Sequence, residues 1–207
     1  MGRDRRARSS GAARSRSRLR SSGRPTNARP VVAAEDFAVA LLLGNQVRDL
    51  GLDVAFEHVP IGGRINLNRD GLIVICGPRL SPAVGKVLAS DSALRFERAG
   101  DGPWTLQDVR AGKTYRSGPD CQPPAARDIA YLGRLTRPDG KGTVIVFTGI
   151  HPQGSLGVAH YLATELPDLY RQVGTKPFST LLGVDYDPET SEPGGVTRLT
   201  PLYGTEP

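Results

Sequence analysis

The stretch that decides the fold is VIVFTGIHPQGSLGVAHYL, residues 144–162, in which an apolar run leads through a glycine-rich loop into a segment with helical spacing. The apolar run predicts a buried strand over 143–148. The apolar periodicity after it predicts a helix over about 155–173, bent or ended near Pro167. A strand that turns directly into a helix is the basic unit of α/β folds, and the loop 149–157 between them is a candidate functional site.

A second strand–turn–helix unit lies earlier in the chain. LIVIC at 72–76 is apolar throughout with β-branched residues at its centre, which favours a central strand of a parallel sheet. Ser81 and Pro82 suit the N-cap and the first position of a helix over 81–88. In each unit a glycine follows the strand and another stands eight residues later, which suggests two related halves. These glycines are Gly77 and Gly85, and Gly149 and Gly157.

Hydrophobic periodicity and turn residues predict the other elements of the fold. They are a helix over 37–50, strands over 53–59, 128–136, 178–185 and 196–202, and a β-hairpin insertion at about 94–117. Alternation of strands and helices predicts an α/β fold, a Rossmann-like sandwich with a largely parallel sheet and an inserted antiparallel hairpin.

Charge divides the chain of 207 residues into two parts. Residues 1–30 carry ten Arg and one Asp, a balance of +9, whereas the other 177 residues carry 17 basic and 20 acidic groups and sum to −3. We therefore expect 1–30 to be a disordered Arg/Ser-rich tail and 31–207 to form one domain. The tail could bind nucleic acid non-specifically, or be only a solvated tail or a start site placed too far upstream.

Two absences limit the classes of protein to consider. The sequence has no run of about 18 apolar residues, so we predict no membrane span. Cys76 and Cys121 lack Cys-x-x-Cys spacing and a nearby histidine cluster, which argues against a zinc site and a disulfide framework. Both patterns fit a cytoplasmic protein, although a bridge between the two cysteines stays open.

The loops that follow the two apolar strands predict a ligand site. In open parallel sheets these loops meet at one crevice, where backbone N–H groups at helix starts favour an anion. We expect the N–H groups around Gly154 and Ser155, with the Ser155 hydroxyl, to face a small anionic ligand and Arg79 to pair with it. The alternative is that the glycines serve only turn geometry and helix–sheet packing. The predicted ligand-binding residues are Gly77, Pro78, Arg79, Gly149, His151, Gly154 and Ser155.

Neither loop carries a standard nucleotide fingerprint. The spacing G-x-G-x-x-G is absent from 149–157, and no G-K-[ST] ends either loop. A P-loop is excluded and an NAD site is disfavoured, so no cofactor is predicted.

Four segments resemble an uncharacterised bacterial Rossmann-like domain that occurs alone or fused to helix-turn-helix or signalling modules. They are LIVICGPRLSP (72–82), WTLQDVRAGKTYRS (104–117), DIAYLGRL (128–135) and GIHPQGSLGVAHYL (149–162). This resemblance implies a fold but no reaction. The last segment is also similar to the G-G-x-G-T-x-x-E element of lysine-decarboxylase-like nucleotide-binding domains. Gly154 and Ser155 match its Gly-Thr, but no glutamate follows, which leaves hydrolysis without its catalyst.

Residues that could do chemistry are few, and no catalytic residue or metal ligand is assigned. His151 could act as an acid or base, whereas Cys76 is expected to be a small hydrophobe. Asp128 and Arg134 share a strand face that Tyr131 does not, so the three form no triad. Two further carboxylates, Asp185 and Asp187, could hold a divalent cation but suit a turn better.

The sequence therefore predicts a small-molecule binding or sensing domain in bacterial regulation, without catalysis of its own. Its expected ligand is a small anion, with a nucleotide-like molecule as one candidate. One alternative is a nucleotide or nucleoside hydrolase or transferase that uses His151 or Asp128. Another is an accessory protein tethered to nucleic acid through its Arg-rich tail. A homo-oligomer is left open.

Overall fold

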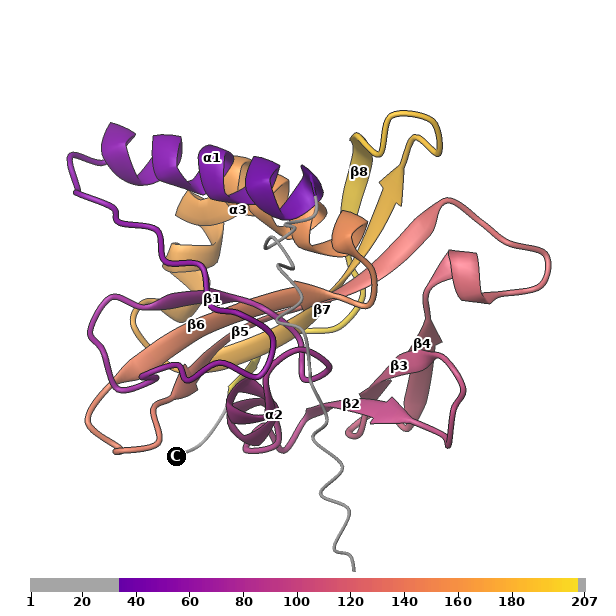
Figure 1. Cartoon of the computed structure of the whole chain (residues 1–207), viewed down its shortest axis with the longest axis horizontal. Helices are drawn as coiled ribbons and strands as arrows, with labels where there is room; N and C mark the ends of the chain where they lie inside the picture. The colour runs from indigo at the N-terminus through magenta and orange to yellow at the C-terminus, as the bar shows by residue number, and fades with distance from the viewer. Residues whose placement is uncertain (1–33, 205–207) are drawn as a thin grey trace, which may run out of the picture. The chain divides into compact units, whose positions relative to one another are not determined.

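The computed structural model describes residues 34–204, so the predictions for the tail 1–30 lie outside the described residues. The helices are α1 Ala34–Asp49, α2 Pro82–Leu88 and α3 Pro152–Val173, with a short 3-10 helix η1 Gly118–Asp120. Sheet A contains β1 Ile73–Ile75, β5 Arg127–Thr136, β6 Thr143–Gly149, β7 Phe178–Tyr186, β8 Pro193–Arg198 and β9 Tyr203–Gly204. Sheet B contains β2 Leu94–Arg98, β3 Trp104–Asp108 and β4 Lys113–Arg116. The chain is thus a mixed α/β protein (Figure 1).

The prediction of a largely parallel sheet is wrong. Sheet A has the order β1-β6-β5-β7-β8, with β9 also on β7, and only β1 and β6 pair in parallel. The short turn 137–142 joins β5 to β6, and a connection of that length can only return the chain antiparallel, because parallel neighbours need a crossover of about a dozen residues. An apolar run indicates that a strand is covered on both faces of the sheet. It does not indicate whether the strand runs parallel or antiparallel to its neighbours.

Three other predicted elements differ from those in the structure. The expected strand at 53–59 is absent, because this stretch is mostly exposed and pairs with no described strand. Phe56 in it instead lies against Gly44 of α1. The expected hairpin insertion is a three-stranded antiparallel sheet, and α3 begins at Pro152 and continues through Pro167.

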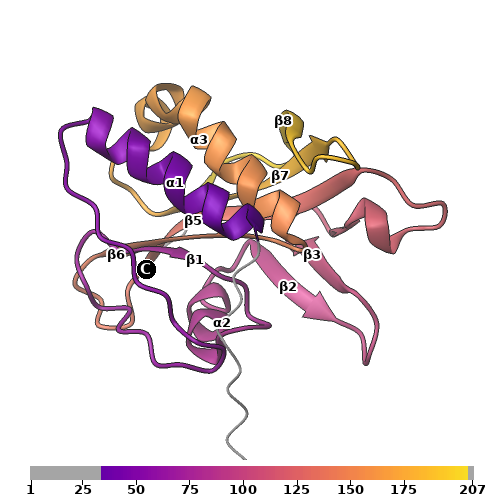
Figure 2. The same cartoon turned by 45° about the horizontal axis from the view of Figure 1, so that its top comes forward.

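Helices α1 and α3 cover one face of sheet A, whereas α2 and sheet B lie on the other face (Figure 2). The alternation along β6 shows this division, since Val144 and Val146 join the core on the α2 side and Phe147 joins the core on the α1 and α3 side. Sheet B is anchored through Phe96, whose ring centroid lies 6.1 Å from that of Tyr131 on β5. The buried Tyr131 hydroxyl donates to Asp91 at 2.9 Å. Both faces of β5 and β6 are therefore covered.

The contact between α3 and β7 depends on Gly157. A Cβ placed on this residue would overlap both methyl groups of Val184. Its counterpart in the earlier unit is Gly85 of α2, where a Cβ would meet Pro78 at 3.4 Å, an ordinary contact. The two glycines that match in sequence thus serve different needs.

We expect Gly157→Ala to lower the free energy of unfolding by about 1–3 kcal/mol, the usual cost of forcing extra atoms into a packed core. The matched control Gly85→Ala should leave stability unchanged or raise it slightly, because alanine favours a helix and has room there. Chemical denaturation measures both variants. Equal effects would contradict this account of the packing.

Candidate functional site

A crevice lies where the two strand–turn–helix units meet. The chain leaves the parallel neighbours β1 and β6 toward opposite faces of the sheet, because α2 packs on one side and α3 on the other. Such a switch point is where ligands bind in open α/β sheets. The cavity volume of the crevice is about 70 Å³, well below the range of about 300–1,000 Å³ typical of ligand pockets. It can hold one small group.

Six of the seven predicted ligand-binding residues line this crevice. They are Gly77, Pro78, Arg79, Gly149, His151 and Ser155. The seventh, Gly154, is buried and does not line it. The structure thus brings the two loops together, although they are about 70 residues apart in the sequence.

A carboxylate of the protein itself occupies the start of α3. The Oδ2 atom of Asp128 accepts from the backbone N–H groups of His151 and Gly154, at 2.9 and 2.8 Å. Its Oδ1 atom accepts from the N–H of Ile129 at 2.7 Å, and the side chain is fully buried. Asp128 therefore provides the anion that the helix N-terminus favours. The N–H of Gly154 points to Asp128, not to a ligand as the sequence had suggested.

Burial raises the pKa of Asp128. The N–H donors of His151 and Ile129 lower it by less, so the pKa stays above its usual value. The group has no accessible surface from which to reach a substrate. Its three backbone contacts instead place it in the framework beneath the crevice. This placement argues against Asp128 as the acid or base of the hydrolase alternative.

The glycines of the loop are explained by the packing around Asp128. A Cβ on Gly154 would lie 2.5 Å from Asp128 Oδ2 and 2.6 Å from the Cα of Gly149. A Cβ on Gly149 would lie 2.7 Å from the same oxygen. The Ser155 hydroxyl accepts from the N–H of Gly149 at 3.0 Å, which ties the start of α3 to the end of β6. Chain geometry alone thus requires these residue types.

The side chain of His151 is held by Asp120 from η1. The imidazole Nε2 lies 2.9 Å from Asp120 Oδ2, and both side chains are partly exposed. A carboxylate at one ring nitrogen fixes the orientation of the ring and leaves Nδ1 as the other polar atom. Such a pair can bind an anion or move a proton. No pattern in the sequence indicates Asp120, which lies 31 residues away from His151.

Cys76 has the properties of a thiol rather than of a nucleophile. Burial, followed by the nearby charge of Asp36, raises its pKa to about 11. At neutral pH the group is protonated, and its Sγ donates to the carbonyl of Gly77 at 3.3 Å. This agrees with the expectation of a small hydrophobic residue at the end of β1.

The wall of the crevice includes three residues that the sequence did not indicate. Asp36 comes from the first turn of α1, and Phe96 and Trp104 come from sheet B. The two rings meet edge to face, with centroids 6.5 Å apart. No periodicity links these positions to the two loops, because each belongs to a different element.

Other candidates do not join the site. Arg134 donates to the carbonyl of Gly174 beyond the end of α3, so Asp128, Tyr131 and Arg134 serve separate contacts. Asp187 accepts from two N–H groups of its own turn, which supports the turn interpretation, and Asp185 pairs with Arg127 at 3.3 Å. Among residues 34–204 no three His, Cys, Asp or Glu side chains are grouped as metal ligands.

The chain matches no protein-family model, no curated protein and no solved structure. The resemblances suggested by its motifs therefore stay predictions. Within the described part of the chain, no helix has both the length and the apolar character needed to cross a membrane.

Replacing Asp128 should destabilise the protein, because three buried N–H groups would lose their acceptor. We expect Asp128→Ala to cost about 2–4 kcal/mol, since each unsatisfied buried donor costs about 1–3 kcal/mol before water enters. Asp128→Asn should also be destabilising, because one of its two polar atoms must then face an N–H as a donor. Chemical denaturation measures the loss, and wild-type stability in both variants would contradict this role.

Alkylation should report the protonation of Cys76. Because its pKa is raised to about 11, its rate with iodoacetamide near pH 8 should fall well below that of a free cysteine, whose pKa is about 8.5. The rate should then rise as the pH approaches 11, provided that the protein stays folded by circular dichroism. Mass spectrometry of the peptide that contains Cys76 measures the rate. Peptide-like reactivity at pH 8 would contradict the buried thiol.

Proposed function

We propose that this domain binds a small ligand through an anionic group, as a regulatory sensor without catalysis of its own. The observation that carries the proposal is that Arg79 and His151, from two different loops, both line the crevice at the switch point between β1 and β6. Arg79 is exposed and forms no ion pair with another described residue. Its guanidinium is thus available to a phosphate or carboxylate.

The surroundings of Arg79 restrict the ligand further. The crevice, with a cavity volume of about 70 Å³, suits a single phosphate or carboxylate. The rest of the ligand would therefore lie in the opening beside Phe96 and Trp104. Aromatic side chains at this place favour a flat ring, as in a nucleotide. Asp36 lies in the same wall, and burial, followed by Glu35, raises its pKa. Its carboxylate opposes a second negative charge at that position.

The His151–Asp120 pair supports one alternative, a hydrolase or transferase acting on a nucleotide or nucleoside. A histidine oriented by a carboxylate is suited to proton transfer. Among the described residues that line the crevice, Cys76 is protonated, the Ser155 hydroxyl accepts from Gly149 and the Thr148 hydroxyl donates to the Gly149 carbonyl, so none of these three is activated as a nucleophile. The tethering alternative depends on residues 1–30, which are outside the described range.

Calorimetry with inorganic phosphate and with adenosine monophosphate tests the proposal. Arg79→Gln should weaken both ligands about tenfold or more, because a hydrogen bond to a charged group contributes about 1.5–3 kcal/mol. Asp36→Asn should strengthen the binding of phosphate at pH 8, because it removes a nearby negative charge. Arg95→Gln is the matched control, since Arg95 is exposed on sheet B and does not line the crevice.

Binding that is equal in Arg79→Gln and Arg95→Gln would remove the proposed site. The same samples test for catalysis. Conversion of adenosine monophosphate by the wild type that is lost in His151→Ala would favour the enzyme over the sensor.

A further inference from the structure

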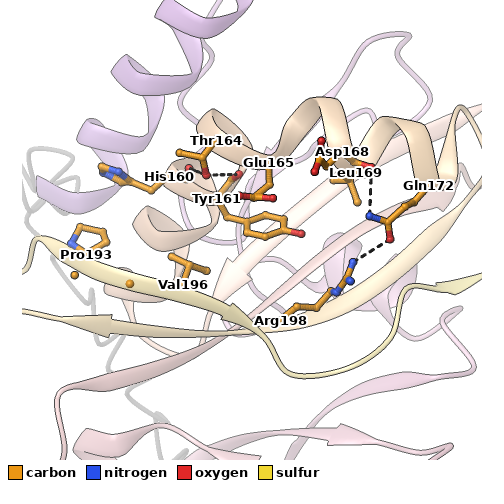
Figure 3. A pocket seen from close by; sticks show the side chains of 12 residues that line it. His160, Tyr161, Thr164, Glu165, Asp168, Leu169, Gln172, Pro193, Val196 and Arg198 are labelled. Atoms are coloured by element: carbon orange, nitrogen blue, oxygen red, sulfur yellow. Dashed lines mark hydrogen bonds between the residues drawn. The ribbon is translucent and has the colours of Figure 1, made fainter.

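A second depression lies between α3 and the edge strand β8 (Figure 3). Its volume of about 540 Å³ is within the range of about 300–1,000 Å³ typical of ligand sites. We call it the α3–β8 groove. Side chains of α3 between His160 and Gln172 form its wall, and β8 from Pro193 to Arg198 forms its floor. It shares no lining residue with the crevice.

The floor of this groove is a free sheet edge. Sheet A ends at β8, and within residues 34–204 no strand pairs with the outer side of β8. The N–H of Leu199, just after β8, donates to Leu181 of β7 at 2.8 Å. Because hydrogen-bonding direction alternates along an antiparallel strand, the N–H and C=O groups of Val196 and Arg198 point away from β7. They form an open template for another strand.

Protection of this edge is confined to the two ends of β8, where Pro193 lacks a backbone N–H and Arg198 carries a charge. Gly194 and Gly195 stand at the beginning of β8 and are both exposed. Natural edge strands are usually protected by bulky charged residues or by a covering segment. Here the backbone lies open beside a helix, which is the arrangement in which domains add an extended peptide to a sheet.

The groove also offers a seat for side chains of such a peptide. Tyr161 of α3 and Val196 of β8, both half-buried, bring apolar surface to its centre beside the buried Leu169, and the three belong to the α3-side core. Figure 3 shows the Tyr161 ring directed from α3 toward β8. Alternate side chains of an added strand would point toward this surface.

Charge selects the kind of peptide. Glu165 stands in the middle of the wall and forms no ion pair with another described residue. Asp168 is also in the wall, although Arg171 pairs with it. Arg198, bonded to Gln172 at 3.3 Å, places a positive charge at one end only. The middle of the groove is therefore complementary to a basic side chain, and Arg198 fixes the direction of the peptide by repelling such a residue at its end.

We infer that the α3–β8 groove binds an extended, basic segment of a partner protein, which adds as a strand to the free edge of β8. Backbone hydrogen bonds to Val196 and Arg198 provide the affinity. The apolar seat and Glu165 provide the selection. This site is separate from the crevice, so it stands or falls independently of the proposed function.

A synthetic heptapeptide of alternating valine and threonine, with arginines at its third and fifth positions so that both face the same side near the middle, tests this inference. Titration followed by amide chemical shifts should move the signals of Val196 and Arg198. A matched peptide with glutamates in place of the arginines should bind at least about tenfold more weakly, and one with a central proline should not bind, because proline cannot complete the strand. Glu165→Lys should reverse the preference for the basic peptide.

Glu97→Lys is the control variant, because Glu97 is an exposed carboxylate on sheet B, outside the groove. It changes the net charge by the same amount and should leave the preference unaltered. Unmoved Val196 and Arg198 amides, or equal effects of the two lysine variants, would overturn the inference. So would a protein that is dimeric through β8 at assay concentration, because a second copy would then be the occupant of this edge.

Discussion

The carboxylate of Asp128 holds together the parts of the molecule from which the crevice is built. It joins β5 to the start of α3 by accepting from Ile129, His151 and Gly154. Burying a charge is costly, and three N–H donors and the positive end of a helix of 22 residues offset that cost only in part, because the pKa of Asp128 stays raised. Because these donors are committed, a ligand in the crevice has to be recognised mainly by side chains. Arg79 and His151 are the ones in position to do so.

The elements next to the crevice could be predicted because their signals are local. An apolar β-branched run followed by Ser81 and Pro82 identifies β1 and α2, and Ser81 does cap α2 by accepting from Val84. Strand direction could not be read from the same runs, since any strand covered on both faces is apolar. The turn 137–142 held the relevant information. Connection length, more than strand composition, determines whether neighbours are parallel.

The candidate site was predicted in part for a similar reason. Loops at the ends of β1 and β6 meet because the strands are neighbours, which topology favours. The contribution of Asp128, and the pairing of Asp120 with His151, depend on contacts between residues 23 to 31 positions apart. No periodicity encodes such contacts. A glycine-rich helix start can arise from the approach of a ligand or from that of an internal carboxylate, and the two leave the same residues in the sequence.

The shortness of β1 has a consequence for how the crevice could act. β1 has only three residues and lies at an edge of sheet A, whereas β6, which leads to His151, has seven and lies inside the sheet. The segment after β1, which carries Arg79, is thus among the least stable parts of the sheet against local unfolding. The segment after β6, which carries His151, is among the most stable. A molecule that bridged the two would add its binding free energy to this seam. Ligand binding would then reduce the mobility of the β1 edge of sheet A. A neighbouring protein could respond to this reduced mobility without any change of fold.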